Sequence, residues 1–275
     1  RARLGHMGHV LEAMLDMHTD PSQITATFGA HVVQCEADQL LEHYLDADRA
    51  LVEDKRKEIL GFFDTPDPQS DPLTRKLSAE DLHTAAQAAV ALDSYIEEQA
   101  LDGLAYYYRG WDDNEYERIA AAMILGNSML TARGIPCAGE ADLKTCAAMF
   151  IQDHFGAGGS FCELYLLDFE GGFVVAGHDG PGHLGICAEQ PILRGMKLFH
   201  GKAGHGVSVE FNVKNGPVLK CLTITFLLGL GFIFMETHEF YSMILDGNGP
   251  ERSGFLSAFF YVHLNLFAQL DFKCF

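Results

Sequence analysis

Apolar and polar positions follow two different rhythms along the chain, and the rhythm changes near residue 157. Before that point apolar residues mostly recur three or four positions apart, which is typical of amphipathic helices. After it, short runs of β-branched and aromatic residues are separated by glycine-rich turns, which is typical of antiparallel strands. The sequence therefore predicts an α/β domain over residues 1–157, followed by a β-rich domain over residues 158–275 that forms an antiparallel sheet or barrel.

The spacing of apolar residues in the first domain predicts six helices, at 1–18, 36–44, 46–63, 78–100, 115–130 and 140–155. Ser78 with Asp81 three residues later is a helix N-cap signature. The run 28–33 predicts a short strand, and the apolar run 104–108 predicts a buried one. Helices and strands in this order favour a parallel sheet covered by helices, in which ligands bind at the carboxyl ends of the strands.

In the second domain, runs bounded by turn residues predict five strands, at 161–167, 172–177, 196–199, 206–213 and 218–226. The fourth of these alternates strictly, with valine and phenylalanine at odd positions and polar residues between them. A period of two is that of a strand with one buried face.

The charge of the chain is strongly negative, with 38 acidic residues against 19 lysines and arginines among 275 residues. Nucleic acids and anionic membranes attract basic surfaces, so the composition argues against both as partners. The seven cysteines are scattered and odd in number, which is typical of reduced thiols and not of a disulfide framework.

The predicted location is the cytoplasm. No basic-then-apolar signal peptide opens the sequence, and the longest apolar run, 226–235, is about half of what a bilayer span requires. The chain begins at Arg1 without an initiator methionine, so we expect a fragment of a longer product.

The candidate chemistry lies between residues 137 and 183, where Glu140, Glu163 and His178 stand in separate predicted elements. Two carboxylates and an imidazole suit a divalent cation such as Mn²⁺, because carboxylate oxygens are hard ligands and imidazole suits first-row transition ions. Glu140 is expected at the N-terminus of a helix, where the helix dipole favours its ionised form.

The residues around these three side chains resemble the family of L-arabinose and L-fucose isomerases. The resemblance runs from about residue 1 to about 224, and four short segments carry it in the same order as in the family: Gly139-Glu140-Ala141-Asp142 with Lys144-Thr145, Ser160-Phe161-Cys162-Glu163, Asp168-Phe169-Glu170, and Gly177-His178.

This resemblance implies a metal-dependent aldose–ketose isomerase that acts on a small sugar through an ene-diol intermediate. It implies Mn²⁺ bound by Glu140, Glu163 and His178, with the two glutamates as paired acid and base. It also implies a β-barrel C-terminal domain and a homo-oligomer. The family's N-terminal domain is missing here, and the histidine pair that supplies the last metal ligand is replaced by the sequence 270–275.

Three further residues are predicted to contact the substrate. The resemblance implies Met7, because the family's sugar site lies near this segment. Tyr108 and Trp111 are expected at the carboxyl end of a strand, where aromatic rings can stack on the apolar face of a sugar ring. The alternative interpretation is packing: Met7 on a helix face that packs against the sheet, and Tyr108 and Trp111 in the packing of the sheet itself.

Two other functions stay open on the sequence alone. The first is a non-catalytic homologue or fragment that retains the fold and has a role in assembly. The second is a metal-dependent hydrolase that uses the same ligands to activate water.

Overall fold

The structure is a computed structural model that describes residues 1–11, 14–67, 69, 77–109, 114–171, 173–178, 180–195, 207–211, 227, 231, 234–235, 237–249 and 252–253. The chain divides into two compact units, Arg1–Lys214 and Asn215–Phe275.

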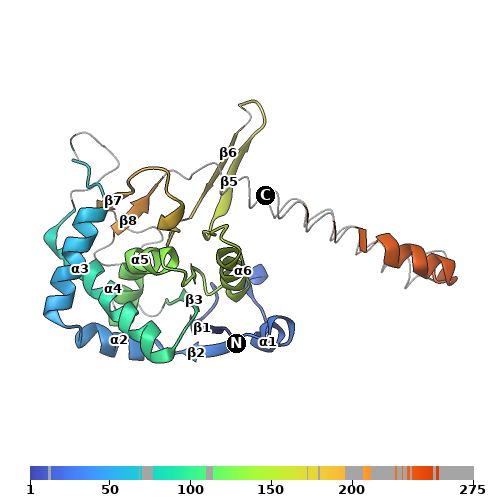
Figure 1. The fold of residues 1–275 in the computed structure, drawn as a ribbon, viewed down its shortest axis with the longest axis horizontal. Coiled ribbons are helices and arrows are strands. Elements are labelled where there is room, and N and C mark those ends of the chain that lie inside the picture. The colour runs from blue at the N-terminus through green and yellow to red at the C-terminus, as the bar shows by residue number, and fades with distance from the viewer. Residues whose placement is uncertain are drawn as a thin grey trace. The chain divides into compact units, whose positions relative to one another are not determined.

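A parallel four-stranded sheet forms the centre of the first unit (Figure 1). Its strands, in the spatial order β2-β1-β3-β4, are β2 (His31–Cys35), β1 (Arg3–Gly8), β3 (Gly103–Tyr107) and β4 (Cys137–Ala138). The predicted α/β class, with a parallel layer and antiparallel strands after it, is confirmed.

The helix predicted over residues 1–18 is wrong, because this segment contains the central strand β1 and the short 3₁₀ helix η1 (Leu15–Met17). Helices cover both faces of the sheet, so β1 buries apolar side chains on both sides: Leu4 is 1% and Met7 2% exposed. A strand buried on both faces has no alternation of apolar and polar residues, and its apolar spacing can imitate that of a helix.

The other five predicted helices are confirmed, with ends that differ by up to three residues, and the helix α1 was not predicted. The helices are α1 (Pro21–Phe28), α2 (Ala37–Leu45), α3 (Arg49–Phe62), α4 (Ala79–Gln99), α5 (Glu115–Ala132) and α6 (Leu143–His154). The sequence 20–22 is typical of a break between elements, whereas Asp20 is the N-cap of α1 and Pro21 its first residue. Proline fits that position because its missing N–H has no partner there in any helix.

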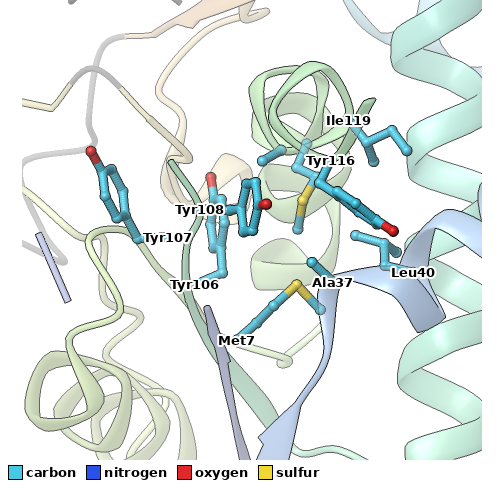
Figure 2. A pocket seen from close by; sticks show the side chains of 10 residues that line it. Met7, Ala37, Leu40, Tyr106, Tyr107, Tyr108, Tyr116 and Ile119 are labelled. Atoms are coloured by element: carbon cyan, nitrogen blue, oxygen red, sulfur yellow. The ribbon is translucent and has the colours of Figure 1, made fainter. Parts of the chain in front are cut away.

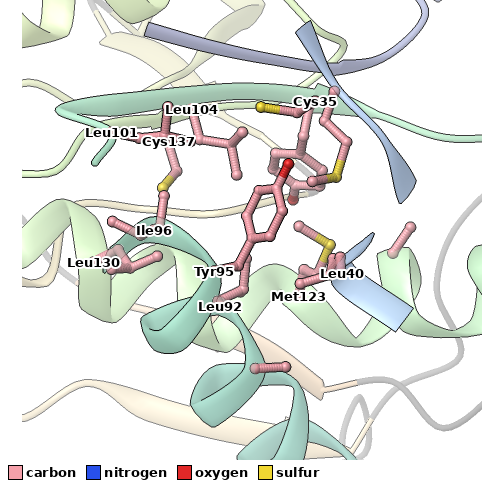
Figure 3. Close-up of a cluster of buried hydrophobic side chains, with 14 of the residues drawn as sticks. Cys35, Leu40, Leu92, Tyr95, Ile96, Leu101, Leu104, Met123, Leu130 and Cys137 are labelled. Atoms are coloured by element: carbon pink, nitrogen blue, oxygen red, sulfur yellow. The ribbon is translucent and has the colours of Figure 1, made fainter. Parts of the chain in front are cut away.

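Helices α1 and α6 pack on one face of the sheet, and α2, α4 and α5 pack on the other. The second face holds a core in which Tyr95 of α4 is fully buried between Leu40, Leu104 and Met123 (Figure 3). Helices α4 and α5 approach each other closely because the residues at their contact, Ala89 and Gly126, are small. A Cβ atom on Gly126 would lie 2.9 Å from the Cα atom of Ala89.

Two antiparallel strand pairs follow the parallel sheet. They are β5 (Glu163–Asp168) with β6 (Phe173–Gly177), and β7 (Ile192–Gly195) with β8 (Val207–Glu210), and the 3₁₀ helix η2 (Leu184–Ile186) lies between the pairs. Leu193 and Val207 bury the second pair in a core shared with α3, α4 and α5. The strands predicted at 196–199 and 218–226 lie outside the described residues.

In the second unit, residues 237–245 are helical. Among the described helices, none has the length and apolar content needed to cross a lipid bilayer. The domain boundary predicted at residue 157 stays a prediction.

Candidate metal site

Glu140 lies just beyond β4, at the carboxyl edge of the parallel sheet. Glu140 and Ala141 both have left-handed backbone conformations, with φ of 58° and 57°. The Ala141 N–H donates a hydrogen bond to the Tyr106 carbonyl oxygen (3.1 Å), which ties this turn to the end of β3. Successive left-handed residues other than glycine are uncommon, and strained backbone of this kind concentrates at functional sites.

The helix N-terminus predicted at Glu140 is wrong, because α6 begins at Leu143 with Asp142 as its N-cap. The Asp142 carboxylate accepts hydrogen bonds from the backbone N–H groups of Lys144 and Thr145. Asp142 therefore occupies the capping position, and the Glu140 carboxylate is not used as the helix cap.

Glu163 and His178 are brought together by the antiparallel pairing of β5 and β6. Glu163 pairs with Gly177 in the ladder, and His178 follows directly after Gly177. The Nδ1 atom of His178 lies 3.9 Å from the Oε2 atom of Glu163. The hairpin thus places two residues that are distant in sequence at its base.

The imidazole of His178 fills a narrow space against the backbone of Gly139. A Cβ atom on Gly139 would lie 2.7 Å from Nε2 of His178, a separation that real Cβ atoms essentially never show. Phe161 contacts the ring edge-to-face, with ring centroids 4.4 Å apart. The side chain of His178 is only 9% exposed, so its orientation is fixed by packing.

Ligand atoms of Glu140, Glu163 and His178 all lie within 4.8 Å of one another. Two ligands of one first-row ion can be separated by at most twice the bond length, about 4.2 Å. Side-chain adjustments of about half an ångström would therefore let all three bind one cation. The donor set and its geometry fit a divalent ion.

His6 approaches the same turn from β1. Its imidazole lies 3.4 Å from the side-chain oxygen of Gln34 and hydrogen-bonds to the backbone of Ala141. Burial lowers the pKa of His6, so the neutral ring is favoured. His6, Gly139 and Phe161 support the site but were not predicted. The only sequence signal for two of them is that Gly139 and Phe161 stand inside the segments that carry the isomerase resemblance.

Met7 and Tyr108, predicted to contact a substrate, line a different space. They border a hollow of about 10 Å³ together with Tyr106 and Tyr116 (Figure 2). That volume admits about one water molecule. Met7 belongs to the core on the α2, α4 and α5 face. Trp111 lies outside the described residues, and the substrate contacts stay a prediction.

No family model matches the chain. Several curated relatives that match short stretches of it carry the name cytochrome bo(3) ubiquinol oxidase subunit 3. The Pseudomonas putida protein is 56% identical over 57 residues, which are 21% of this chain and 28% of that protein. The Buchnera aphidicola (subsp. Baizongia pistaciae) protein is 54% identical over 55 residues, and the Pseudomonas aeruginosa protein is 53% identical over 45 residues. These stretches are 19% and 16% of this chain, and 28% and 22% of those relatives.

These names correct four predictions: the family, the function, the location and the area of metabolism. The relatives are called oxidase subunits, so the membership in the arabinose and fucose isomerase family is wrong, and so is sugar isomerisation as the function. The cytoplasmic location is wrong as well, since the relatives are named as subunits of a cytochrome oxidase. The predicted assignment to carbohydrate metabolism is therefore also wrong, and no match supports a sugar as partner.

The metal ligands are not addressed by these matches. The chain spans under a third of the length of each of these three relatives, and the cluster of Glu140, Glu163 and His178 rests on geometry alone. The acid and base roles of the two glutamates stay a prediction.

Proposed function

We propose that the first unit of the chain binds one divalent transition-metal cation, Mn²⁺ or an ion of similar size, through Glu140, Glu163 and His178. The observation that carries the proposal is the convergence of these three side chains within 4.8 Å from three separate places in the fold. The ligand types favour a first-row ion over Ca²⁺, because imidazole is a poor ligand for hard cations.

Three protein ligands leave coordination positions for water or for an oxygen-bearing molecule. A cation held in this way acts as a Lewis acid on whatever oxygen occupies those positions. The side chain of Glu163 is 32% exposed, whereas that of His178 is 9% exposed. Solvent therefore reaches the site at Glu163. A ligand would approach from the side of Glu163.

Metal titration of the full chain tests the proposal. After removal of metal with a chelator, we expect the chain to bind one Mn²⁺, as measured by loss of the free Mn²⁺ signal in electron paramagnetic resonance. Glu163→Gln should weaken binding by at least about 10-fold, because the amide keeps the shape and removes the charge. Glu170→Gln is the matched control, because it makes the same change at an exposed position on the same hairpin.

Equal affinity in Glu163→Gln and Glu170→Gln would contradict the proposal. A second measurement is independent of affinity: Mn²⁺ should raise the unfolding temperature of the unaltered chain and leave that of the double variant Glu163→Gln/His178→Gln unchanged, since a bound ligand stabilises the folded state.

The matches favour a second function, association with protein. The relatives are numbered subunits by name, and we infer that this chain also has a protein partner, in an oxidase that uses ubiquinol. Co-expression of the tagged full chain with the remaining Pseudomonas putida subunits tests this. We expect co-purification that an excess of untagged subunit 3 displaces. Capture that the untagged subunit does not reduce would contradict it.

A further inference from the structure

The hairpin of β5 and β6 extends away from the helices of the first unit (Figure 1). The described part of the chain gives this sheet two strands only. Several of its side chains are apolar and exposed: Tyr165 is 57%, Leu166 50%, Leu167 44%, Phe169 88% and Val175 40% exposed. Leu166 and Leu167 are successive residues of β5 and point to opposite faces, so both faces of the hairpin carry exposed apolar side chains.

The two outer edges of the hairpin differ in how well they are protected from further pairing. Strand β5 carries Glu163 and Asp168, and its register shifts between Leu164 and Leu166, so that Tyr165 is an extra, bulged residue. Charges and bulges are the features by which natural edge strands avoid pairing with other chains. The β5 edge is therefore protected.

Strand β6 has neither feature. Its sequence, Phe-Val-Val-Ala-Gly, contains no charged residue and no proline, and the register places the extra residue of the bulge on β5. An unprotected edge strand of this composition can accept another strand by main-chain hydrogen bonding.

We propose that β6 pairs antiparallel with β6 of a second copy of this chain, about a two-fold axis at Val175. Val175 is the middle residue of the strand, so this register pairs the whole of β6 with its twin and forms the four-stranded sheet β5-β6-β6-β5. A two-fold contact must be compatible with itself, and of the two described edges of this hairpin the β6 edge meets its own copy without bringing like charges together. Pairing through β5 would set Glu163 near Asp168 of the other copy.

The net charge of the chain gives a way to distinguish a second copy of the chain from a basic partner protein. Two copies that each carry a net charge of −19 repel, and salt screens that repulsion while leaving apolar contacts intact. Self-association should therefore strengthen between 50 mM and 500 mM NaCl. A basic partner protein on the same hairpin would show the opposite dependence.

Disulfide trapping of the full chain tests the register. In a Cys162→Ser background, Val175→Cys should form a cross-linked dimer on mild oxidation, because residues at the axis face each other within disulfide distance. Ala176→Cys is the control, since its twin would lie two residues further along the partner strand. No cross-link from Val175→Cys, or equal cross-linking from both positions, would overturn the proposal.

A charge on the edge gives the second test. Val175→Lys should weaken the dimer by at least about 10-fold in dissociation constant by sedimentation, since it sets two lysines opposite each other. Leu45→Lys, at an exposed apolar position on α2 (65% exposed, against 40% for Val175), should leave it unchanged. Both variants should still bind Mn²⁺, which shows that the unit is folded. A dimer that resists Val175→Lys would overturn the proposal.

Discussion

Gly139 and His178 are in such close contact that a Cβ atom on Gly139 would lie 2.7 Å from the Nε2 atom of the imidazole. The absence of a side chain at residue 139 therefore permits the position of a proposed metal ligand 39 residues later in the chain. The backbone of Gly139 is not left-handed, so alanine is excluded there by the ring and not by the backbone.

We predict that Gly139→Ala displaces His178 and weakens Mn²⁺ binding about 10- to 100-fold, the usual effect of disturbing the support of a metal ligand. Metal titration measures the affinity. Gly61→Ala is the control, because a Cβ atom built at that helical glycine meets open space beyond the backbone of its own helix. It should leave the affinity unchanged and raise the free energy of unfolding by roughly 0.5–1 kcal/mol. An unchanged Mn²⁺ affinity in Gly139→Ala would contradict the proposal that His178 is a metal ligand.

The cap of the long helix α4 gives a prediction about stability. The Ser78 hydroxyl oxygen accepts a hydrogen bond from the Asp81 N–H (3.0 Å), and the Asp81 carboxylate accepts one from the Ser78 N–H (3.1 Å). Ser78→Ala should lower the free energy of unfolding by about 1 kcal/mol in urea denaturation. The same change at the exposed Ser94, within the helix, should have no effect or a slight stabilising one. Equal losses at both positions would show that the cap contributes nothing.

The sequence predicted the start of α4 because the capping signal, Ser78 with Asp81, lies within four residues. It predicted the strands β5 and β6 for a similar reason, since turn residues separate two short β-rich runs, but it did not predict which strands pair. The convergence of Glu140, Glu163 and His178 also came from the sequence, but through the ordered segments around them and not through their spacing.

Other features depend on contacts that are distant in sequence. The left-handed turn at Glu140 is held by the hydrogen bond from Ala141 to Tyr106, which no local pattern indicates, so a helix was predicted to begin there. Strand β1 was predicted as a helix because burial on both faces removed the alternation that marks a strand.

His183 should make the stability of the chain depend on pH. It is 6% exposed, its Nδ1 atom accepts a hydrogen bond from the Gly185 N–H (3.1 Å), and burial lowers the pKa of the ring. Because the folded state disfavours protonation, the unfolded state binds more protons as the pH falls below about 6.5. The stability contributed by neutral His183 is present above that pH and is lost as the pH falls.

Urea denaturation at pH 7.5 and pH 5.5 checks this dependence. The difference in unfolding free energy between the unaltered chain and His183→Gln should be larger at pH 7.5 than at pH 5.5. His154→Gln is the control, since that histidine is exposed. A difference that grows towards acid pH would mean that His183 is protonated in the folded chain.

A substitution at Asn127 of α5 is expected to stabilise the folded chain. It is 0% exposed, and neither its side-chain nitrogen nor its side-chain oxygen has a hydrogen-bond partner among the described residues. Met123 and Leu130, one turn before and after it, belong to the apolar core. A buried amide without partners costs about 1–3 kcal/mol. Asn127→Leu keeps the number and branching of the side-chain heavy atoms and removes the polar atoms, so it should raise the free energy of unfolding by about that amount in urea.

The neighbouring Ser128→Ala is the matched comparison, because it also removes a buried polar group from α5. The Ser128 hydroxyl donates to the Ile124 carbonyl oxygen (2.7 Å) and accepts from the Gly182 N–H (3.0 Å), so its loss leaves a backbone N–H without that partner. It should lower the free energy of unfolding by about 1 kcal/mol. Opposite signs for two adjacent polar-to-apolar changes would show that hydrogen bonding, and not burial alone, sets the contribution of each side chain. A loss of stability in Asn127→Leu would mean that the amide is satisfied within the folded chain.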